Sequence, residues 1–210
     1  MRIGLVSDTH GNVGALGRAL ELFAQAQTDR VFFLGGGCAD LDAALARRRR
    51  APAGARVPTT DLEFLGAVRG ALSREAGLGG DPLTGRVVKI ASRDCPEYAS
   101  GALPRKHLDM AEGFICCLVH DTAELTRDDI ANATLLFHGN SERAQLLQIG
   151  PRCFVTPGHL RDHAPEGSPP GFALLDVEPG GVELIAYSAD GAEQWRDQAA
   201  FGVRGKVTVR

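Results

Sequence analysis

The stretch Gly4-Leu5-Val6-Ser7-Asp8-Thr9-His10-Gly11-Asn12 decides how this chain is interpreted. The residues before Ser7 are apolar and predict a short buried strand, and those after it are polar and predict a loop at the strand's carboxyl end. In the next segment, 13–27, apolar residues recur at spacings of three and four, which predicts an amphipathic helix. A second apolar run, 31–34, leads into three glycines. The opening therefore predicts a β-loop-α-β unit, with polar side chains at a strand end where α/β proteins bind ligands.

The pattern changes between about residues 41 and 86. Alanine-rich sequence leads to Arg47–Arg50, then to a Pro/Gly/Ala-rich stretch and a second amphipathic pattern around Leu62–Leu72. We interpret this segment as a basic helical insertion that leaves the sheet at a carboxyl strand end and packs over or beside the mouth of the site. Consecutive arginines at a helix end interact favourably with the helix dipole and are well solvated, so no nucleic-acid role is assigned to them.

Strand patterns resume after this insertion. Several short apolar runs predict strands, and two runs separated by a Gly-Gly pair near the C-terminus predict an antiparallel hairpin. The run 114–119 is followed by His120, and the run 133–137 is followed by His138. The predicted strands are 87–90, 114–119, 133–137 and 153–155, and the predicted hairpin is 172–187.

Composition limits the class of protein. The chain has 210 residues, of which 44% are hydrophobic and 23% are charged, so we expect one globular domain spanning residues 1–210. A net charge of -3 provides no global positive field, and nucleic acid is therefore not an expected partner. The sequence has neither a membrane-spanning apolar run nor a signal-peptide pattern, which favours a cytoplasmic location. Five cysteines without a CxxC pair argue against a disulfide framework and against a zinc knuckle.

Asp8 and His10 carry the first chemical signal. A carboxylate and an imidazole two residues apart offer oxygen and nitrogen ligands suited to manganese, iron or zinc. The alternative is structural: the Asp8 carboxylate caps the following helix, and the His10 ring is hydrogen-bonded within the loop. His120 and His138 are open to the same two interpretations, metal ligand or satisfied strand-end histidine. The remaining histidines lie in polar or Pro/Gly-rich segments and are expected at the surface: His107, His159 and His163.

The motif from Gly4 to Asn12 closely resembles the first motif of the calcineurin-like metallophosphoesterases, especially their small bacterial phosphodiesterase branch. The resemblance covers about residues 1–40 and 87–190. It implies a four-layer α/β sandwich, with two mixed β-sheets flanked by helices, and the family's metal-dependent hydrolysis of phosphoesters. Further segments resemble the family's later motifs in the same order: Phe33-Leu34-Gly35-Gly36, Cys95–Pro104, Leu118–Asp121, Leu135–Ser141 and Phe154–Gly158.

Several positions depart from the metal-binding pattern that this resemblance implies. Gly36 stands where the family has an aspartate that bridges both metals, and Gly139 and Ser141 stand where it has two histidines. The family's asparagine falls at Arg93 or, with a shift of one residue, at Asp94. The candidate metal ligands are therefore the retained Asp8, His10 and His120, with Asp94 and His138 as further candidates.

Two dications roughly 4 Å apart repel each other strongly unless anions bridge them. We therefore expect at most one divalent transition metal (manganese, iron, zinc or nickel), held by Asp8, His10 and His120, or none. This predicts a catalytically impaired or inactive phosphoesterase homologue that acts as a binding or regulatory module for a phosphate-containing ligand or a protein partner. The alternative is a divergent phosphodiesterase or phosphatase that uses a single metal or a rearranged site, with His120 and Asn12 as candidate catalytic residues.

Overall fold

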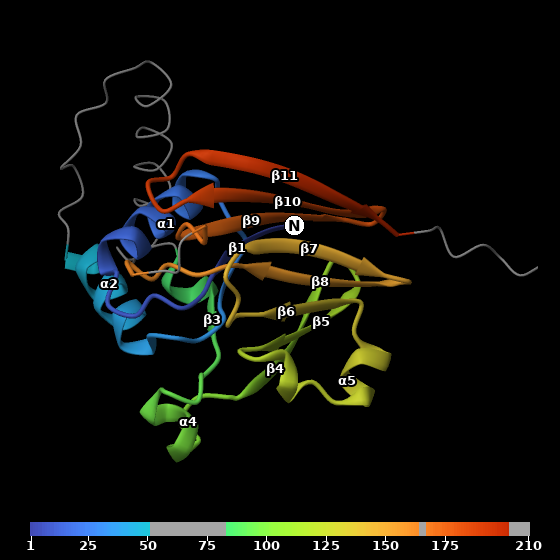
Figure 1. Cartoon of the computed structure of the whole chain (residues 1–210), viewed down its shortest axis with the longest axis horizontal. Coiled ribbons are helices and arrows are strands. Elements are labelled where there is room, and N and C mark those ends of the chain that lie inside the picture. Colours follow the sequence, from blue (N-terminus) through green and yellow to red (C-terminus); the bar gives the residue numbers. More distant parts are fainter. Residues whose placement is uncertain (51–82, 164–166, 202–210) are drawn as a thin grey trace, which may run out of the picture.

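Two β-sheets lie face to face, with helices on their outer sides (Figure 1). The computed structural model describes residues 1–50, 83–163 and 167–201. The two mixed sheets and their flanking helices form the four-layer architecture expected from the sequence. The helices in the described part of the chain are α1 (Val13–Gln25), α2 (Cys38–Arg50), α4 (Pro96–Ser100) and α5 (Arg127–Asn132), with 3-10 turns at Thr84–Arg86 and Thr122–Glu124.

The first sheet joins the N-terminal and C-terminal parts of the chain, in the strand order β11-β10-β9-β1-β2-β3. The first three strands in sequence are parallel, and β9 pairs antiparallel with β1. Antiparallel pairing then continues from β9 to β10 and β11. The strands are β1 (Arg2–Val6), β2 (Arg30–Phe33), β3 (Val87–Lys89), β9 (Gly171–Glu178), β10 (Gly181–Ser188) and β11 (Glu193–Ala200).

The second sheet is built from the middle of the chain, in the order β4-β5-β6-β8-β7. Its three central strands β5, β6 and β8 are parallel, and an antiparallel strand closes each edge. The carboxyl ends of β1, β2, β5 and β6 supply the loops of the site described below. The strands are β4 (Lys106–Ala111), β5 (Phe114–Val119), β6 (Leu135–His138), β7 (Ala144–Ile149) and β8 (Arg152–Pro157).

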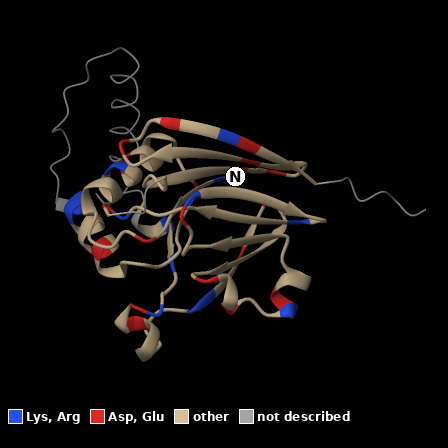
Figure 2. Ribbon diagram, in the orientation of Figure 1, with Lys and Arg blue, Asp and Glu red and all other residues tan. Residues whose placement is uncertain are grey.

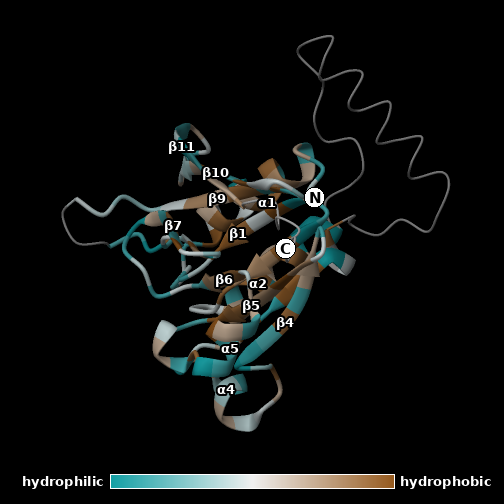
Figure 3. Cartoon of the chain, turned by 90° about the vertical axis from the view of Figure 1, so that its right-hand side faces the viewer, coloured by the Kyte–Doolittle hydropathy of each residue, from teal (hydrophilic) through white to brown (hydrophobic). Residues whose placement is uncertain are grey.

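The alternation of side chains along β1 explains how the layers are joined. Ile3 and Leu5 are fully buried in the core between the two sheets, where Phe32 and Phe137 meet edge to face with ring centroids 5.1 Å apart. Burial of each such side chain contributes roughly 1.5–3 kcal/mol. Figure 3 shows the corresponding hydrophobic colouring of the strands.

Gly4 faces the opposite side of β1, toward α1. A Cβ atom at this position would lie 2.7 Å from the ring of Phe23, so glycine permits the close approach of the helix to the sheet. The predicted amphipathic pattern is confirmed, because the buried face of α1 consists of Ala15, Leu16, Ala19, Leu20 and Phe23.

Helix α2 contains the first part of the predicted insertion. Leu41, Ala44 and Leu45 are buried in the same apolar cluster as the inner face of α1. The basic run Arg47–Arg50 ends this helix (Figure 2). The second predicted helix of the insertion, around Leu62–Leu72, lies outside the described residues.

The edge strand β11 is covered with charged and polar side chains (Figure 2). Glu193, Arg196 and Asp197 alternate in sign along it, and Arg196 pairs with Glu193 at 2.8 Å. Charges on an edge strand disfavour pairing with a further chain. In the described part of the chain, the structure has no helix with the length and hydrophobicity needed to cross a membrane.

Candidate active site

Asp8 and His10 lie in a loop whose backbone is held in an unusual conformation. Their φ angles are 53° and 39°, values that residues other than glycine adopt infrequently and at a cost of about 1–3 kcal/mol each. Backbone hydrogen bonds join this loop to the glycine loop after β2, from Asp8 N to Gly35 O at 2.8 Å and from Thr9 N to Gly36 O at 2.6 Å. The loop is therefore fixed at the carboxyl end of two parallel strands.

The Asp8 carboxylate is 2% exposed and forms the centre of the site. Its Oδ2 accepts hydrogen bonds from the Ser7 hydroxyl at 2.6 Å and from the Asn140 backbone N–H at 2.8 Å. Its Oδ1 faces three nitrogen-bearing side chains: His10 Nε2 at 3.3 Å, His120 Nε2 at 3.9 Å and Arg161 at 3.7 Å. Oδ2 thus accepts hydrogen bonds from Ser7 and Asn140, whereas Oδ1 faces the nitrogen-bearing side chains of the site.

His120 is oriented by the backbone. Its Nδ1 lies 2.7 Å from the Leu34 carbonyl oxygen, which can only accept, so Nδ1 carries a proton and donates it. Nε2 is then the nitrogen that faces Asp8. A histidine held through Nδ1 by a backbone carbonyl is the usual arrangement of a metal ligand, and an imidazolium in the same place would pair with the carboxylate.

His10 lies between two carboxylates. Its Nε2 faces Asp8, and its Nδ1 lies 3.9 Å from Asp94 Oδ2. Partial burial raises the pKa of Asp94, but hydrogen bonds from Ser92 and from its own backbone, together with the positive charges of His10 and His120, hold the pKa below its usual value. The structure therefore brings Asp94, rather than the neighbouring Arg93, toward the retained motif. Arg93 instead pairs with Glu124 at 3.4 Å.

Two other candidates have different contacts. Asn12 caps α1, because its Oδ1 accepts from Ala15 N at 3.0 Å and its Nδ2 donates to Leu160 O at 2.8 Å. The structural interpretation that assigned this cap to Asp8 is wrong. His138 Nδ1 lies 3.0 Å from Gly139 O, and burial lowers the pKa of its ring.

Arg161 and His159 were not identified as site residues from the sequence. His159 is 1% exposed, so its predicted surface position is wrong; its ring lies between Ser168 Oγ at 3.1 Å and Arg161 N at 3.2 Å. Burial and the charge of Arg161 lower the pKa of His159. Arg161 Nε is buried without a hydrogen-bond partner in the described part of the chain. The signal for both was their place just after β8, whose carboxyl end adjoins the site.

The glycines at the altered positions are tightly enclosed. Gly36 has φ 73°, and a Cβ atom there would lie 2.6 Å from both Asp8 Cα and Asp8 Oδ1. A Cβ atom at Gly139 would lie 2.7 Å from Leu34 O and 2.9 Å from His120 Nδ1. Real Cβ atoms do not approach this closely, so neither backbone position accepts a ligand side chain as it stands. Ser141 instead donates its hydroxyl to Arg143 O at 3.1 Å.

These residues do not fit a two-metal centre. The bridging carboxylate has no place at Gly36, and the Arg161 guanidinium supplies a fixed positive charge beside Asp8 that would repel a second cation. In the described part of the chain, Asp8, His10 and His120 also do not bring their ligand atoms within 4.8 Å of one another, unlike Cys38, Cys95 and Glu97. One ion beside Asp8 Oδ1 therefore needs a shift of the exposed His10 ring.

The fold and the site together define a class of protein. Residues 1–180 match the calcineurin-like phosphoesterase superfamily domain, and the chain belongs to this superfamily. Members of the superfamily typically bind divalent metals.

Three solved structures with the same fold illustrate its range. A predicted phosphoesterase from Streptococcus pneumoniae has a TM-score of 0.61 at 11% identity, covering 95% of this chain and 97% of that one. YfcE, a phosphoesterase from E. coli, has a TM-score of 0.57 at 18% identity, covering 96% and 100%. Vps29 from Chaetomium thermophilum has a TM-score of 0.57 at 15% identity, covering 95% and 97%. Identities this low show the fold alone. A comparison with curated proteins gave no match.

Proposed function

We propose that this chain is a catalytically impaired phosphoesterase homologue that binds a phosphate-containing ligand and does not carry out two-metal hydrolysis. The observation that carries this proposal is the enclosure of Gly36 and Gly139. In two-metal hydrolysis, the ions together orient the phosphate and activate the attacking hydroxide, so both must be held. Without the bridging carboxylate and with Arg161 beside Asp8, we expect at most one divalent transition metal at this site.

Arg161 supports the binding of an anionic group. A buried N–H donor without an acceptor costs about 1–3 kcal/mol, and Arg161 Nε is such a donor in the described part of the chain. A phosphate oxygen is a suitable acceptor, because a guanidinium offers forked donors that match phosphate geometry. The loops of the site, which follow β1, β2, β5 and β6, lie along one edge of the paired sheets (Figure 1). His10, whose side chain is 41% exposed and whose Nε2 lies 3.3 Å from the same Asp8 oxygen, supplies a second donor.

The alternative function is a divergent phosphodiesterase or phosphatase with a single metal. It is favoured by the orientation of His120, whose Nε2 faces Asp8 Oδ1 while Nδ1 is fixed by Leu34 O. In that case Asp8, His10 and His120 would hold the ion, and its charge would acidify a bound water. Asp94 and His138 are the further ligands that a rearranged site would recruit.

Metal analysis and an activity assay separate these functions. Protein purified without chelator is analysed for manganese, iron, nickel and zinc, and the measurement is repeated on Asp8→Asn so that only ions lost in the variant are assigned to this site. We expect no more than one such ion per chain and near-background hydrolysis of bis-p-nitrophenyl phosphate with manganese, nickel or zinc. Two Asp8-dependent ions, or robust turnover that Asp8→Asn abolishes, would establish a working enzyme instead.

Phosphate binding is measured separately, by calorimetric titration with inorganic phosphate. Loss of a charge-assisted hydrogen bond costs about 1.5–3 kcal/mol, so Arg161→Gln should weaken binding roughly tenfold to a hundredfold. Arg143→Gln is the matched control, because this neighbouring arginine donates to Gly167 O and has no ion pair with Asp8 among the described contacts. Equal affinities of wild type and Arg161→Gln would contradict the proposed role of Arg161.

We also propose that the protein is one domain and works in the cytoplasm. The first sheet supports the single domain, because β1 pairs with both β2 and the distant β9. All five cysteines are free and buried, which fits a reducing compartment. A protein partner at the insertion is the alternative to a small ligand. Capture of a partner that is lost on deletion of residues 51–80, with phosphate binding unchanged, would favour that alternative.

A further inference from the structure

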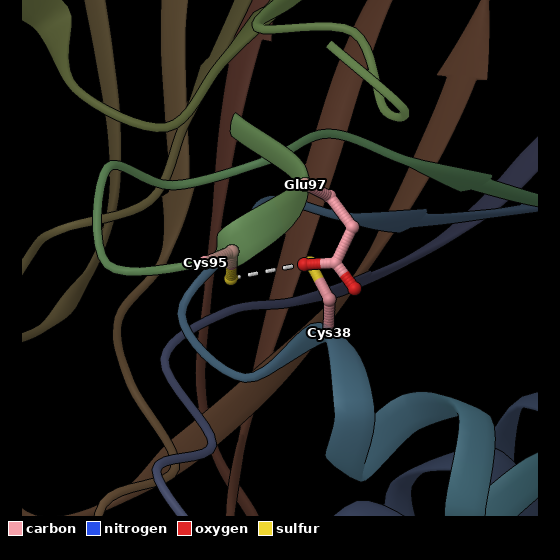
Figure 4. Close-up of side chains that lie close together, drawn as sticks. All are labelled: Cys38, Cys95 and Glu97. Atoms are coloured by element: carbon pink, nitrogen blue, oxygen red, sulfur yellow. Dashed lines mark hydrogen bonds between the residues drawn. The ribbon is translucent and has the colours of Figure 1, made fainter. Parts of the chain in front are cut away.

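Two cysteines and a glutamate converge beneath the glycine loop, outside the Asp8 site (Figure 4). Cys38 is the first residue of α2, Cys95 directly precedes α4, and Glu97 lies in the first turn of α4. The two sulfur atoms are 3.4 Å apart, and the ligand atoms of all three residues lie within 4.8 Å of one another. Cys38 and Cys95 are 57 positions apart in sequence, and the pairing of β2 with β3 brings them together.

The cluster is separated from the Asp8 carboxylate by Ser92 and Gly36. The Ser92 hydroxyl oxygen accepts the Gly36 N–H at 2.8 Å on one side and lies 3.1 Å from Cys95 Sγ on the other. Cys38 and Cys95 are 1% and 7% exposed, whereas Glu97 is only partly buried. The partly buried Glu97 therefore provides the side from which an ion can enter.

The spacing of the sulfur atoms matches chelation. A tetrahedral zinc ion with Zn–S bonds of about 2.3 Å holds two thiolates about 3.8 Å apart. A disulfide requires about 2.05 Å. The observed 3.4 Å is closer to the chelating distance, and the carboxylate of Glu97 supplies a third ligand of a type that zinc accepts. We propose that Cys38, Cys95 and Glu97 form a binding site for a thiophilic divalent cation such as zinc, distinct from the Asp8 site.

The surroundings of the two thiols shift their pKa values in opposite directions. Burial raises the pKa of Cys95, but hydrogen bonds from Ser92 and from the backbone N–H groups of Cys38 and Gly37 outweigh burial and lower the pKa below its usual value. Burial, with the nearby Cys95 and Glu97, raises the pKa of Cys38 to about 12. The bound cation displaces the Cys38 proton to solvent and compensates the negative charge that otherwise keeps this thiol protonated.

Three protein ligands leave a fourth position for water, as in zinc sites that are not purely structural. Since Cys38 follows Gly35-Gly36-Gly37 directly, an ion at this site anchors the loop whose carbonyl oxygens accept hydrogen bonds from the Asp8 motif and whose Gly36 N–H donates to Ser92. Occupancy therefore stabilises the folded chain, and the stabilisation grows with the logarithm of the free ion concentration once that concentration exceeds the dissociation constant.

Cadmium is the probe, because its thiolate complexes absorb in the ultraviolet and its NMR shift reports the number of sulfur ligands. Titration of the full, reduced chain should give a thiolate-to-cadmium absorption band that saturates at one ion per chain, with a shift typical of two sulfur ligands. Competing zinc should remove the band. This measurement uses the wild-type protein and does not depend on the folding of a variant.

Variants then assign the ligands. Cys38→Ser and Cys95→Ser should each weaken cadmium binding by about tenfold or more, and Glu97→Gln should weaken it while keeping the band. His10→Gln is the control, because it removes a candidate ligand of the Asp8 site and should leave the band unchanged. Circular dichroism confirms that each variant is folded.

Several outcomes would overturn the assignment. These are the absence of the thiolate band in reduced wild-type protein, a band that persists in Cys38→Ser/Cys95→Ser, or loss of the band in His10→Gln. If the protein is isolated with a Cys38–Cys95 disulfide and the two thiols bind no cadmium after its reduction, the pair is assigned to redox chemistry instead. None of these outcomes bears on the phosphate titration, so the two proposals fail independently.

Discussion

The two halves of the candidate active site differ in how much of the family pattern they retain. On the side of β1, Asp8, His10 and Asn12 present polar side chains, whereas positions 36 and 139 on the facing loops are glycines and present none. The retained residues hold the structure together: the Asp8 carboxylate accepts hydrogen bonds from Ser7 and Asn140, and Asn12 caps α1.

This difference shows that structural roles alone are sufficient reason to keep the polar residues of the first motif. Removal of Asp8 or Asn12 would leave buried donors without acceptors or a helix without its cap, which costs folding free energy whether or not the protein is an enzyme. No such cost attaches to glycine at positions 36 and 139, where the backbone of neighbouring loops fills the space. An intact first motif is therefore weak evidence of catalysis.

The largest effect is expected from the placement of a candidate metal ligand at position 139, Gly139→His. Its Cβ atom would meet Ser7, the Leu34 carbonyl and the His120 ring, so we expect a loss of about 3 kcal/mol or more in the free energy of unfolding. Urea denaturation measures it. Ser141→His is the matched control, because Ser141 is only partly buried and should change stability by less than about 0.5 kcal/mol.

The outcome of this substitution tests the comparison directly. If Gly139→His folds with wild-type stability and gains an Asp8-dependent metal, position 139 accepts a ligand side chain and the enclosure described here is wrong. The same reasoning applies to Gly36→Asp, whose Cβ atom would lie 2.6 Å from Asp8 Cα and whose backbone would in addition have to adopt φ 73°. Restoring both positions together with Ser141→His should therefore lower stability rather than raise metal occupancy.

Most of the fold could be predicted from the sequence, because its core elements carry simple patterns. The apolar runs of β1, β2 and β5 and the period of α1 correspond to elements within two residues of their predicted bounds. The strands β4, β7 and β11 were missed, since they lie at sheet edges and expose many of their side chains. Unlike the edge strand β3, these three strands carry no continuous apolar run, and their exposed side chains leave no simple pattern in the sequence.

The site could be predicted only where one motif carries it. Asp8 and His10 stand together in the sequence, and His120 follows a strongly apolar strand, so strand-end reasoning named all three as candidates, and the structure brings both histidines within 4 Å of Asp8 Oδ1. Arg161 was missed because an arginine in a Pro/Gly-rich segment has no local signal, and its approach to Asp8 depends on the course of the chain after β8. Cys38 and Cys95 were missed as a pair because only tertiary structure brings them together.

An intermediate effect is expected for Asp8→Asn. The new amide group would place a donor where Asp8 Oδ2 accepts from Ser7 and Asn140, and hydrogen bonds to a charged group contribute about 1.5–3 kcal/mol, so we expect destabilisation of about 2 kcal/mol. Asp94→Asn is the matched control, with a side chain 53% exposed and an expected change below about 0.5 kcal/mol. Thermal and urea unfolding measure both.

A gain in stability for Asp8→Asn would reverse the interpretation of the retained half. Catalytic residues often lower the free energy of unfolding, so that their replacement stabilises the protein. The positive φ angles of Asp8 and His10 make this the informative alternative. Stabilisation would identify the motif as a functional site under strain, whereas destabilisation supports the structural role described here.

The smallest effect lies outside the site, at the capping box of α5, and gives a reference for an interaction that is purely structural. Partial burial raises the pKa of Asp129, but hydrogen bonds from Lys106 and Thr126 outweigh burial and lower the pKa to about 2. Because the folded pKa lies below the unfolded value of 3.8, this carboxylate stabilises the fold above about pH 4, and its contribution is lost as the pH falls toward 2.

Since Lys106 is 37% exposed, solvent screening limits the effect of Asp129 on stability to about 1 kcal/mol. Asp129→Asn should therefore lower stability at pH 7 by this amount and flatten the acid limb of the pH–stability curve, while Asp128→Asn, in the same turn, should leave that limb unchanged. An acid limb as steep in Asp129→Asn as in wild type would assign the acid sensitivity to other carboxylates, such as Asp94 and Asp190, whose pKa values also lie below their usual value.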